Sequence, residues 1–248
     1  MKLFLKTVFL FATVAHASGL FAQTSATDTI NNNLAINNAI NAYHQYLFPE
    51  TNLYNGSEYV NYAYTINEGI PFFETAAFST GNVLYDSILY QNVPLLYDEV
   101  KEIVVIQDPS GRNSIQLNNE KLAGFGLLDH HFVKLQQDSL GRSPIRTGFY
   151  DALYQGKVSV YEKQIKKVLE SVTMTEGVRR HIDEQDVFFV QKGSTVYTVK
   201  NKREVLNILK DRKKEVQQFI KKNKLNVRRA TETSLIKIAS YYDQLTNK

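Results

Sequence analysis

The chain has 248 residues, of which 43% are hydrophobic and 22% are charged, a balance typical of globular proteins and not of disordered ones. The absence of cysteine excludes disulfides, thiol nucleophiles, Cys-based zinc sites and a lipid-modified N-terminal cysteine. The formal net charge of +4 conceals an asymmetry, because residues 200–248 hold 14 Lys and Arg against 5 Asp and Glu, whereas residues 23–199 hold 13 against 20.

The N-terminus has the layout of a secretory signal peptide over residues 1–22. Two lysines precede the apolar run Val8–Ala15, and small residues follow it. We expect cleavage after Ala22, with Ala17 as the alternative. No later stretch reaches the roughly 18 apolar residues that suggest a transmembrane helix. These features predict a periplasmic or secreted protein whose mature chain has no transmembrane segment, and export without cysteine suits a bacterial envelope.

Residues 24–47 predict an amphipathic helix at the start of the mature chain. Asp28 or Thr29 can cap its N-terminus, and Pro49 ends the pattern. We expect this helix to cover one face of a sheet. The apolar residues at near-helical spacing are Ile30, Leu34, Ala35, Ala39, Ile40, Tyr43 and Leu47.

The stretch Gly81–Gln136 organises the chain as a series of short strands separated by turns. Asp86 and Ser87 suit a tight hairpin turn, and the loop Asp108–Asn113 cannot continue a strand. Turns this close together favour an antiparallel meander, since parallel crossovers need about a dozen residues or more. The expected strands cover residues 83–85, 88–90, 93–97, 103–106, 114–117, 122–128 and 131–135.

Four further segments continue the chain to residue 199. Residues 148–154 and 157–161 predict another strand pair, and the stretch that follows, through residue 169, fits either a strand or a helix. Residues 173–186 are charged and have no period, so we expect an exposed excursion. Residues 187–199 predict a second clear hairpin around a Lys-Gly-Ser turn.

From Asn201 onward the apolar period changes from two to nearly four, which predicts three helices in a basic tail over residues 200–248. Asn201 and Asp211 can cap the first and second helices, Asn223 suits the end of the second, and Thr231 begins the third. The fold class predicted for the whole chain is α+β. Over residues 23–199 we expect the N-terminal helix plus an antiparallel meander that closes into a barrel or sandwich. We expect the N-terminal helix and the C-terminal helices of residues 200–248 to pack on an open face.

Residues that could carry chemistry are few. No phosphate-binding loop, dinucleotide fingerprint or GxSxG elbow is present. His130 and His131 are adjacent, so in a strand they would point to opposite faces, and each is expected to be a surface or edge histidine. The carboxylates Asp98-Glu99 and Asp183-Glu184 lie in turn-like regions where acidic residues are expected anyway. The sequence therefore predicts no catalytic residue, metal site or cofactor, and leaves any binding residues undefined.

The organising stretch resembles a recurring pattern in uncharacterised exported proteins of Bacteroidota. The residues that carry the resemblance are Gly81, Val83, Tyr85, Tyr90–Asp98, Gly148–Tyr150, Leu153, Tyr154, Gly156 and the Lys-rich segment Val199–Leu225. A glycine usually follows the Asp of the first hairpin, but Ser87 stands here. The resemblance implies export and one shared fold, and it implies no activity.

Three functions remain open. The first is a non-catalytic cell-envelope module that binds another protein or a surface component. The basic tail either packs against the acidic body or meets an anionic partner such as lipid headgroups or polysaccharide, and nucleic acid is not expected. The alternatives are a periplasmic carrier of a lipid or other apolar ligand, and a hydrolase with dispersed carboxylates. A carrier needs an unfilled apolar cavity, whereas an enzyme needs convergent polar groups with perturbed pKa values.

Overall fold

The computed structural model describes residues 52–247 except 142, 176 and 230. The signal peptide and the helix expected over residues 24–47 lie outside this part of the chain. The strands are β1 (Ser57–Glu58), β2 (Ser79–Tyr85), β3 (Ile88–Asp98), β4 (Ile103–Gln107), β5 (Ser114–Gln116), β6 (Leu122–Leu127), β7 (His130–Leu135), β8 (Gly148–Tyr154), β9 (Val158–Thr173), β10 (Gly177–Lys192) and β11 (Thr195–Val199). A short 3₁₀ turn, η1 (Asn52–Tyr54), precedes them.

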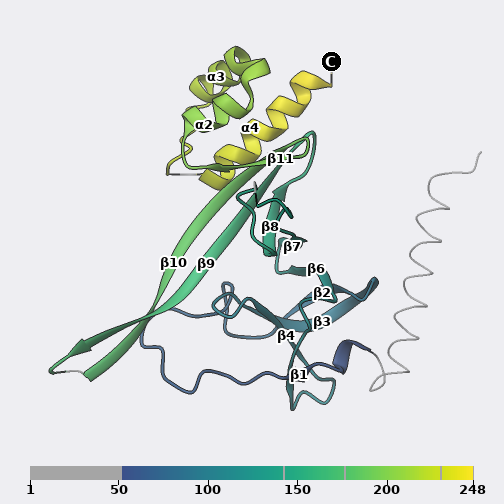
Figure 1. The fold of residues 1–248 in the computed structure, drawn as a ribbon, viewed down its shortest axis with the longest axis vertical. Coiled ribbons are helices and arrows are strands. Elements are labelled where there is room, and N and C mark those ends of the chain that lie inside the picture. The colour runs from purple at the N-terminus through teal and green to yellow at the C-terminus, as the bar shows by residue number, and fades with distance from the viewer. Residues whose placement is uncertain (1–51, 142, 176, 230, 248) are drawn as a thin grey trace, which may run out of the picture. The chain divides into compact units, whose positions relative to one another are not determined.

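All of these strands form one antiparallel sheet in the order β1-β5-β4-β3-β2-β6-β7-β8-β9-β10-β11 (Figure 1). The antiparallel meander is therefore confirmed. The expected closure into a barrel or sandwich is wrong, because β1 and β11 end the order at opposite sides and do not pair. Apolar alternation and turn residues determine which neighbouring strands pair, whereas closure depends on a contact between the first and last strands that no local pattern specifies.

The first hairpin, between β2 and β3, turns at Asp86 and Ser87 as predicted. Both residues have positive φ, 53° and 65°, which is the signature of a type I′ turn. Its twist matches that of the flanking strands, but it places a non-glycine residue in the left-handed region twice. The turn therefore forms with a serine at the position where a glycine would be less strained.

Aromatic rings fill the main core, on one face of the first part of the sheet. Phe125 and Phe132 stack with their centroids 4.6 Å apart, and Tyr97 meets Phe125 at 5.1 Å. Phe149 packs edge-on to Phe125 at 5.3 Å. Leu95, Val104 and Ile106 are among the fully buried residues of the same cluster. Close ring packing of this kind explains why the sequence needs so many Phe and Tyr residues.

Residues 173–186 are largely exposed, as expected, but they are not an irregular excursion, because most of them belong to the 16-residue strand β10, which pairs with β9 along its whole length. Lys167 lies opposite Asp183 and Glu170 lies opposite Arg180, with Arg180 Nε 2.6 Å from Glu170 Oε1. Toward its tip the two-stranded ribbon has solvent on both faces and needs no apolar alternation, so these cross-strand charge pairs replace the period that the sequence lacks.

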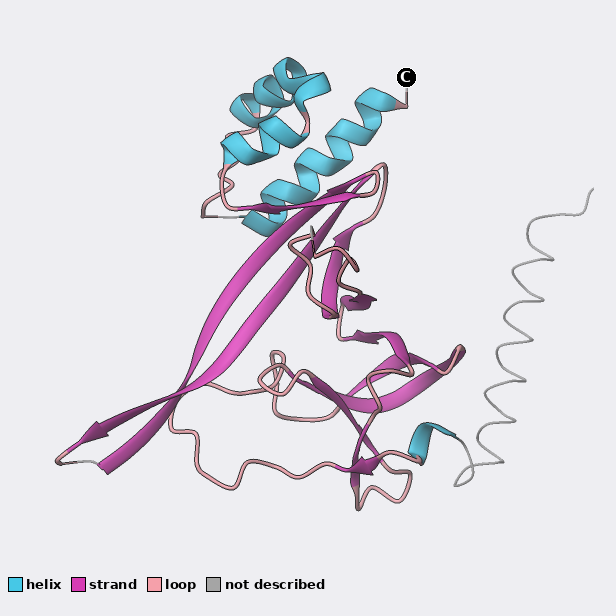
Figure 2. Ribbon diagram, viewed as in Figure 1, coloured by secondary structure: helices cyan, strands magenta, loops and turns pink. Residues whose placement is uncertain are grey.

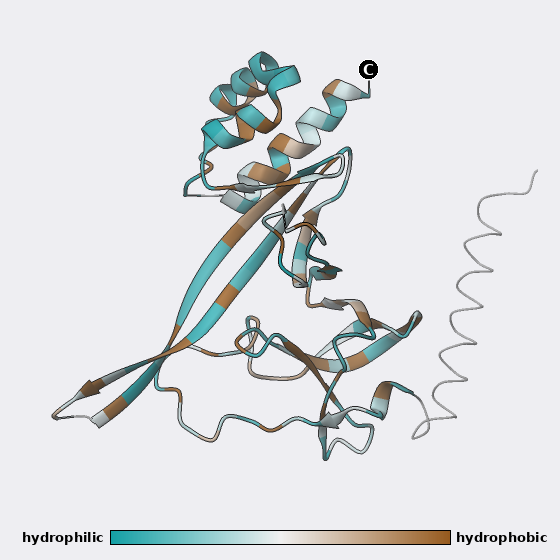
Figure 3. Ribbon diagram, viewed as in Figure 1, coloured by the Kyte–Doolittle hydropathy of each residue, from teal (hydrophilic) through white to brown (hydrophobic). Residues whose placement is uncertain are grey.

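We call residues 163–187 the arm, because there the β9–β10 hairpin extends beyond its neighbours β8 and β11. About midway along the arm, the backbone of Asn67 and Glu68 pairs with β10 around His181. Large apolar side chains lie exposed toward its tip, including Val172 at 74% and Met174 at 107% exposure. Figure 3 shows the brown apolar segments at this end of the ribbon.

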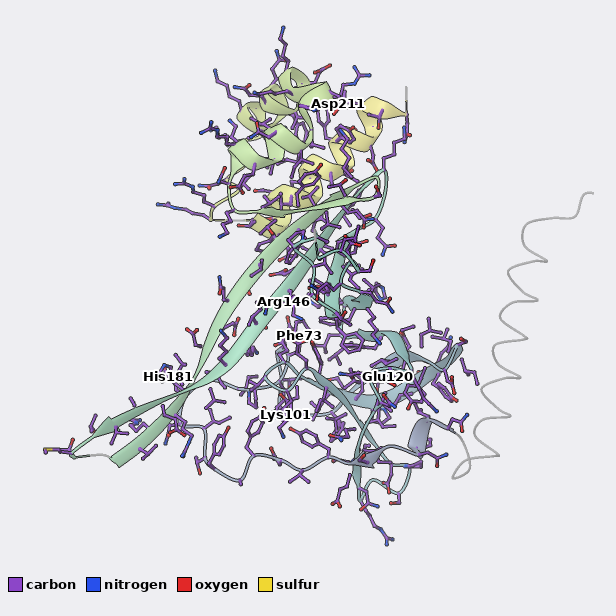
Figure 4. The ribbon with its side chains drawn as sticks, in the orientation of Figure 1. Phe73, Lys101, Glu120, Arg146, His181 and Asp211 are labelled. Atoms are coloured by element: carbon purple, nitrogen blue, oxygen red, sulfur yellow. The ribbon has the colours of Figure 1, made fainter. Side chains whose placement is uncertain are left out.

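The three C-terminal helices are α2 (Lys202–Ile208), α3 (Lys213–Lys222) and α4 (Thr231–Thr246), with the 3₁₀ turn η2 (Lys210–Arg212) between the first two (Figure 2). The Asn201 side chain caps α2 as predicted, accepting from the backbone N–H groups of Arg203 and Glu204. The cap expected from Asp211 is wrong, since α3 begins two residues later without a side-chain cap. Asp211, labelled in Figure 4, instead accepts from Lys192 Nζ and from the Tyr242 hydroxyl.

These helices pack on the end of the sheet formed by β8 to β11. Asp243 on α4 accepts from the Tyr154 hydroxyl at 3.0 Å and from the backbone N–H of Lys157 at 2.9 Å. Gly156 leaves room for this contact, because a Cβ there would lie 1.8 Å from Asp243 Oδ2. Among the described residues, no helix is long and apolar enough to cross a membrane. The shared core comprises Val158, Val160, Val190, Val199, Val205, Leu209, Val216, Ile220, Leu235, Ile238 and Tyr242, with others.

Candidate functional sites

A groove of about 920 Å³ opens in the helical layer, between α2, α3 and the segment that joins α3 to α4. Its lining contains six cationic side chains and no carboxylate: Lys202, Arg203, Lys213, Lys221, Lys224 and Arg228. The remaining lining residues are apolar, such as Ile220, or carry side-chain amides, such as Gln217. A concave surface with cations of one sign raises the local concentration of anions.

Local structure places these cations together. Lys213, Gln217 and Lys221 are spaced by four residues, so they share one face of α3. The Asn226 side chain accepts from the backbone N–H groups of Arg228 and of its neighbour, at 3.1 and 3.2 Å, which fixes the turn that brings Arg228 to the groove. The sequence shows that the tail is basic. It does not show that these six residues converge, because their convergence depends on the packing of α2 against α3.

A second cavity, of about 230 Å³, lies over the sheet where β7, β8, β9 and β10 adjoin the loop before β2. Phe73, labelled in Figure 4, is part of its wall. The cavity is rich in titratable groups, in contrast to an apolar carrier site. It is lined by Phe73, Glu74, Tyr97, Glu99, His130, Phe132, Phe149, Asp151, Glu162, Lys163, Gln164, Asp186 and Glu232.

His130 and Asp151 form the shortest polar contact of this cavity, with Nδ1 of the imidazole 2.5 Å from Oδ2 of the carboxylate. The backbone N–H of His131 approaches the other oxygen, Oδ1, at 3.3 Å. The His130 ring also packs edge-on to Phe73, with centroids 4.9 Å apart. His130 lies on the central strand β7 and is half-buried, so the expected surface or edge position is wrong for it. His131 is exposed on the opposite face, as predicted.

Glu162 lies directly opposite Asp151, on the neighbouring strand β9. Burial raises its pKa to about 8, and the nearby carboxylates of Asp186, Glu232 and Asp151 add to the shift. Within the described chain, the Glu162 side chain has no hydrogen bond or ion pair. The acid form of this residue therefore dominates at neutral pH.

Glu99 is the most buried carboxylate at the cavity. Burial raises its pKa to about 7, although the Lys166 ammonium opposes the shift. Lys166 Nζ lies 3.0 Å from Glu99 Oε2. Apart from this ion pair, that oxygen has no hydrogen-bond partner among the described residues. The sequence predicts an ordinary acidic turn at this residue. The burial of the turn is visible only in the fold.

The other carboxylates that the sequence singled out have structural roles or lie apart. Asp98 is fully buried and accepts from the hydroxyls of Tyr59 and Tyr62 at 2.7 and 2.8 Å, so its charge is satisfied. Asp183 belongs to the arm and does not line the cavity, whereas Asp186 does. In the part of the chain that the structure describes, no cluster of His, Asp and Glu could hold a metal ion.

Comparison with protein-family models, with curated proteins and with solved structures finds no match for this chain. A functional assignment therefore depends on the geometry of concave sites such as the groove and the small cavity described above; a further cavity of about 580 Å³ lies beside Tyr150 and Phe189.

Proposed function

We propose that the protein is an exported binding module of the cell envelope and that its helical groove binds an acidic polysaccharide. The observation that carries this proposal is a groove of about 920 Å³ whose lining has six cations and no carboxylate. The signal-peptide layout of residues 1–22 supports export, which would bring the groove to envelope polymers.

The lining favours a polysaccharide over other anions. Side-chain amides, including those of Asn207 and Gln217, lie among the cations and can donate to or accept from sugar hydroxyls. Aromatic side chains that would stack on nucleobases are missing from the lining. A flat lipid surface would meet protruding side chains first, whereas a polymer chain can enter a groove. Polyuronates have the matching chemistry, with repeated carboxylates and hydroxyls.

The carrier alternative finds less support in the geometry. An apolar ligand would need an unfilled space between the sheet and its cover. The sheet interior near Phe125, Phe132 and Phe149 is occupied by rings in mutual contact. The cavity beside them is rich in carboxylates, which a lipid tail would leave without solvent.

The test uses the mature full-length protein and oligouronates of defined length, with binding followed by calorimetry at two salt concentrations. Lys221→Glu/Arg228→Glu reverses two charges in the groove, and we expect affinity to fall roughly tenfold or more. Lys214→Glu/Lys222→Glu makes the same net change on exposed residues of α3 that do not line the groove, and we expect a loss below about threefold.

Neutral dextran and vesicles of anionic phospholipid complete the design. Binding of oligouronate that both double variants weaken equally would contradict the groove assignment and indicate only a diffuse basic surface. Binding to vesicles alone, with none to oligouronate, would replace the polysaccharide by a membrane as the partner.

A further inference from the structure

We propose that the small cavity over β7 to β10 is a catalytic site for glycosidic bonds, with Asp151 as nucleophile and Glu162 as general acid and base. This activity does not depend on the groove in the helical layer, and it would act on a single sugar residue that enters the cavity. The proposal assigns catalytic residues to the hydrolase alternative, for which the sequence alone suggested none.

Strand register places the two acidic side chains next to each other. Asp151 and Glu162 are directly paired across β8 and β9, so their side chains share one face of the sheet. Cβ atoms of opposite residues in an antiparallel pair lie about 4.5–5.5 Å apart. Side chains that start from such paired positions can bring their carboxyl groups to the roughly 5–5.5 Å separation that retaining glycosidases use. A register shift between Ala152 and Tyr154 follows at once, and such bulges often adjoin active sites because they re-aim side chains.

The surroundings of the two carboxyl groups differ. The Asp151 carboxyl group is held by the His130 ring, with Nδ1 2.5 Å from Oδ2, and by the His131 N–H at 3.3 Å. Glu162 has no such partner among the described residues and faces the carboxylates of Asp186 and Glu232, so it holds its proton at neutral pH. A carboxyl group fixed by polar neighbours beside a second one that keeps its proton suits the division of roles that glycoside cleavage uses.

The reaction proceeds in two steps. Asp151 attacks the anomeric carbon, the bond from that carbon to the leaving oxygen breaks, and the Glu162 proton passes to this oxygen to release an alcohol. Glu162, now a carboxylate, then removes a proton from water as the water oxygen bonds to the anomeric carbon and Asp151 leaves. The products are two sugars, Glu162 regains its proton, and the anomeric configuration is retained.

The cavity wall fits a sugar ring. The aromatic rings of Phe73, Phe132 and Phe149 line it, and such rings present flat apolar faces to the C–H face of a pyranose. A volume of about 230 Å³ suits one monosaccharide unit.

The first experiment offers the mature protein a panel of 4-nitrophenyl glycosides in both anomeric forms, together with the matching 2-deoxy-2-fluoroglycosyl fluorides. We expect release of nitrophenol and a mass increase of one fluorosugar on the peptide that contains Asp151. Asp151→Asn should abolish both signals. Glu162→Gln should lower kcat by roughly 10²–10⁴ for 4-nitrophenyl substrates but much less for dinitrophenyl substrates, whose leaving group needs no proton. It should also remove the alkaline limb of the pH profile.

Asp183→Asn is the matched control, because this carboxylate lies on the arm and does not line the cavity, and its activity should equal that of the wild type. Circular dichroism establishes that each variant is folded. Wild-type turnover no greater than that of Asp151→Asn on every glycoside, with no covalent adduct, would overturn the assignment. So would hydrolysis that both cavity variants leave unchanged.

Discussion

Lys166 on β9 forms an ion pair with Glu99, which follows β3, and the pair is almost completely removed from solvent. The Nζ–Oε2 distance is 3.0 Å, and the two side chains are 4% and 1% exposed. Lys166 also donates to the backbone carbonyl of Phe72 at 2.7 Å. One ammonium group thus fixes the start of the arm to two segments that precede it by more than 60 residues.

Removal of the lysine alone should be much more damaging than removal of both charges. Lys166→Met leaves a buried carboxylate without its cation, and we expect a loss of about 3–5 kcal/mol in the free energy of unfolding at pH 8. Glu99→Gln/Lys166→Met removes both charges and should cost less than half as much. Urea unfolding measures both. Equal losses in the single and double variants would show that the pair contributes nothing as a pair.

Stability should fall as pH rises through neutrality. Glu162 and Glu99 have folded-state pKa values of about 8 and about 7, above the ordinary value of 4.5. Between these limits the folded state binds more protons than the unfolded state, so the stabilising contribution present below about pH 4.5 is lost as pH rises toward 8. We expect the urea midpoint to decrease from pH 5.5 to pH 9.

Glu162→Gln is the test of that slope, because glutamine resembles the protonated acid and does not titrate. The variant should be more stable than the wild type at pH 9 and should depend less on pH. Asp183→Asn, which removes a carboxylate from the exposed arm, should leave the slope as it is in the wild type. A wild-type slope retained in Glu162→Gln would assign the pH dependence to other groups.

The strained turn between β2 and β3 offers a stabilising substitution. Ser87 has φ of 65°, a region that glycine occupies without steric cost. Ser87→Gly should raise the free energy of unfolding by roughly 0.5–1 kcal/mol, since the relief of strain exceeds the added entropy of the unfolded chain. Ser171→Gly, in the extended strand β9, should have the opposite sign. Thermal unfolding of the two variants gives the comparison, and a loss of stability in Ser87→Gly would contradict the type I′ account.

Gly81 is required by the close approach of β2 to β6. A Cβ at this position would lie 2.1 Å from the carbonyl oxygen of Gly126 and 2.8 Å from Leu95 Cδ2. Gly81→Ala should therefore cost more than about 2 kcal/mol, because backbone must move apart in a sheet interior. Gly141→Ala, in a loop with no heavy atom within 4 Å of the added Cβ, should cost about 1 kcal/mol through its positive φ alone. Chemical denaturation measures the difference.

The sequence predicted most local features of the fold and almost none of the cavity. Turn residues such as Asp86 and caps such as Asn201 act on their own neighbourhood, so their effects were visible directly. Asp151 and Glu162 are 11 residues apart in sequence and belong to different strands, and His130 comes from a third. Only the pairing register places them together. The carboxylates that are adjacent in sequence are instead Asp98 and Glu99, and the first of these has a structural role.

Two predictions fail for different physical reasons. Asp211 has the residue type of a helix cap, but Lys192 on β10 and Tyr242 on α4 compete for its carboxylate, so tertiary contacts override the local preference. The sequence does not predict the arm, because its strands bury few apolar side chains. Alternating hydrophobicity indicates that one face of a strand is buried, and it does not indicate extended conformation itself.

The arm should be the part of the described chain that opens locally, is cut by proteases and tolerates changes in length most easily. Beyond Lys163 and Val187 each strand has the other as its main neighbour, and the side chains at the tip bury almost nothing. Such a ribbon opens locally at a small fraction of the global free energy of unfolding, so its amides should exchange with solvent first. A protease cut near Met174 would leave both strands held by the body. Residues could be added or removed in register pairs at this end without disturbing either core, which makes the length of the arm the dimension that evolution or design can alter most freely.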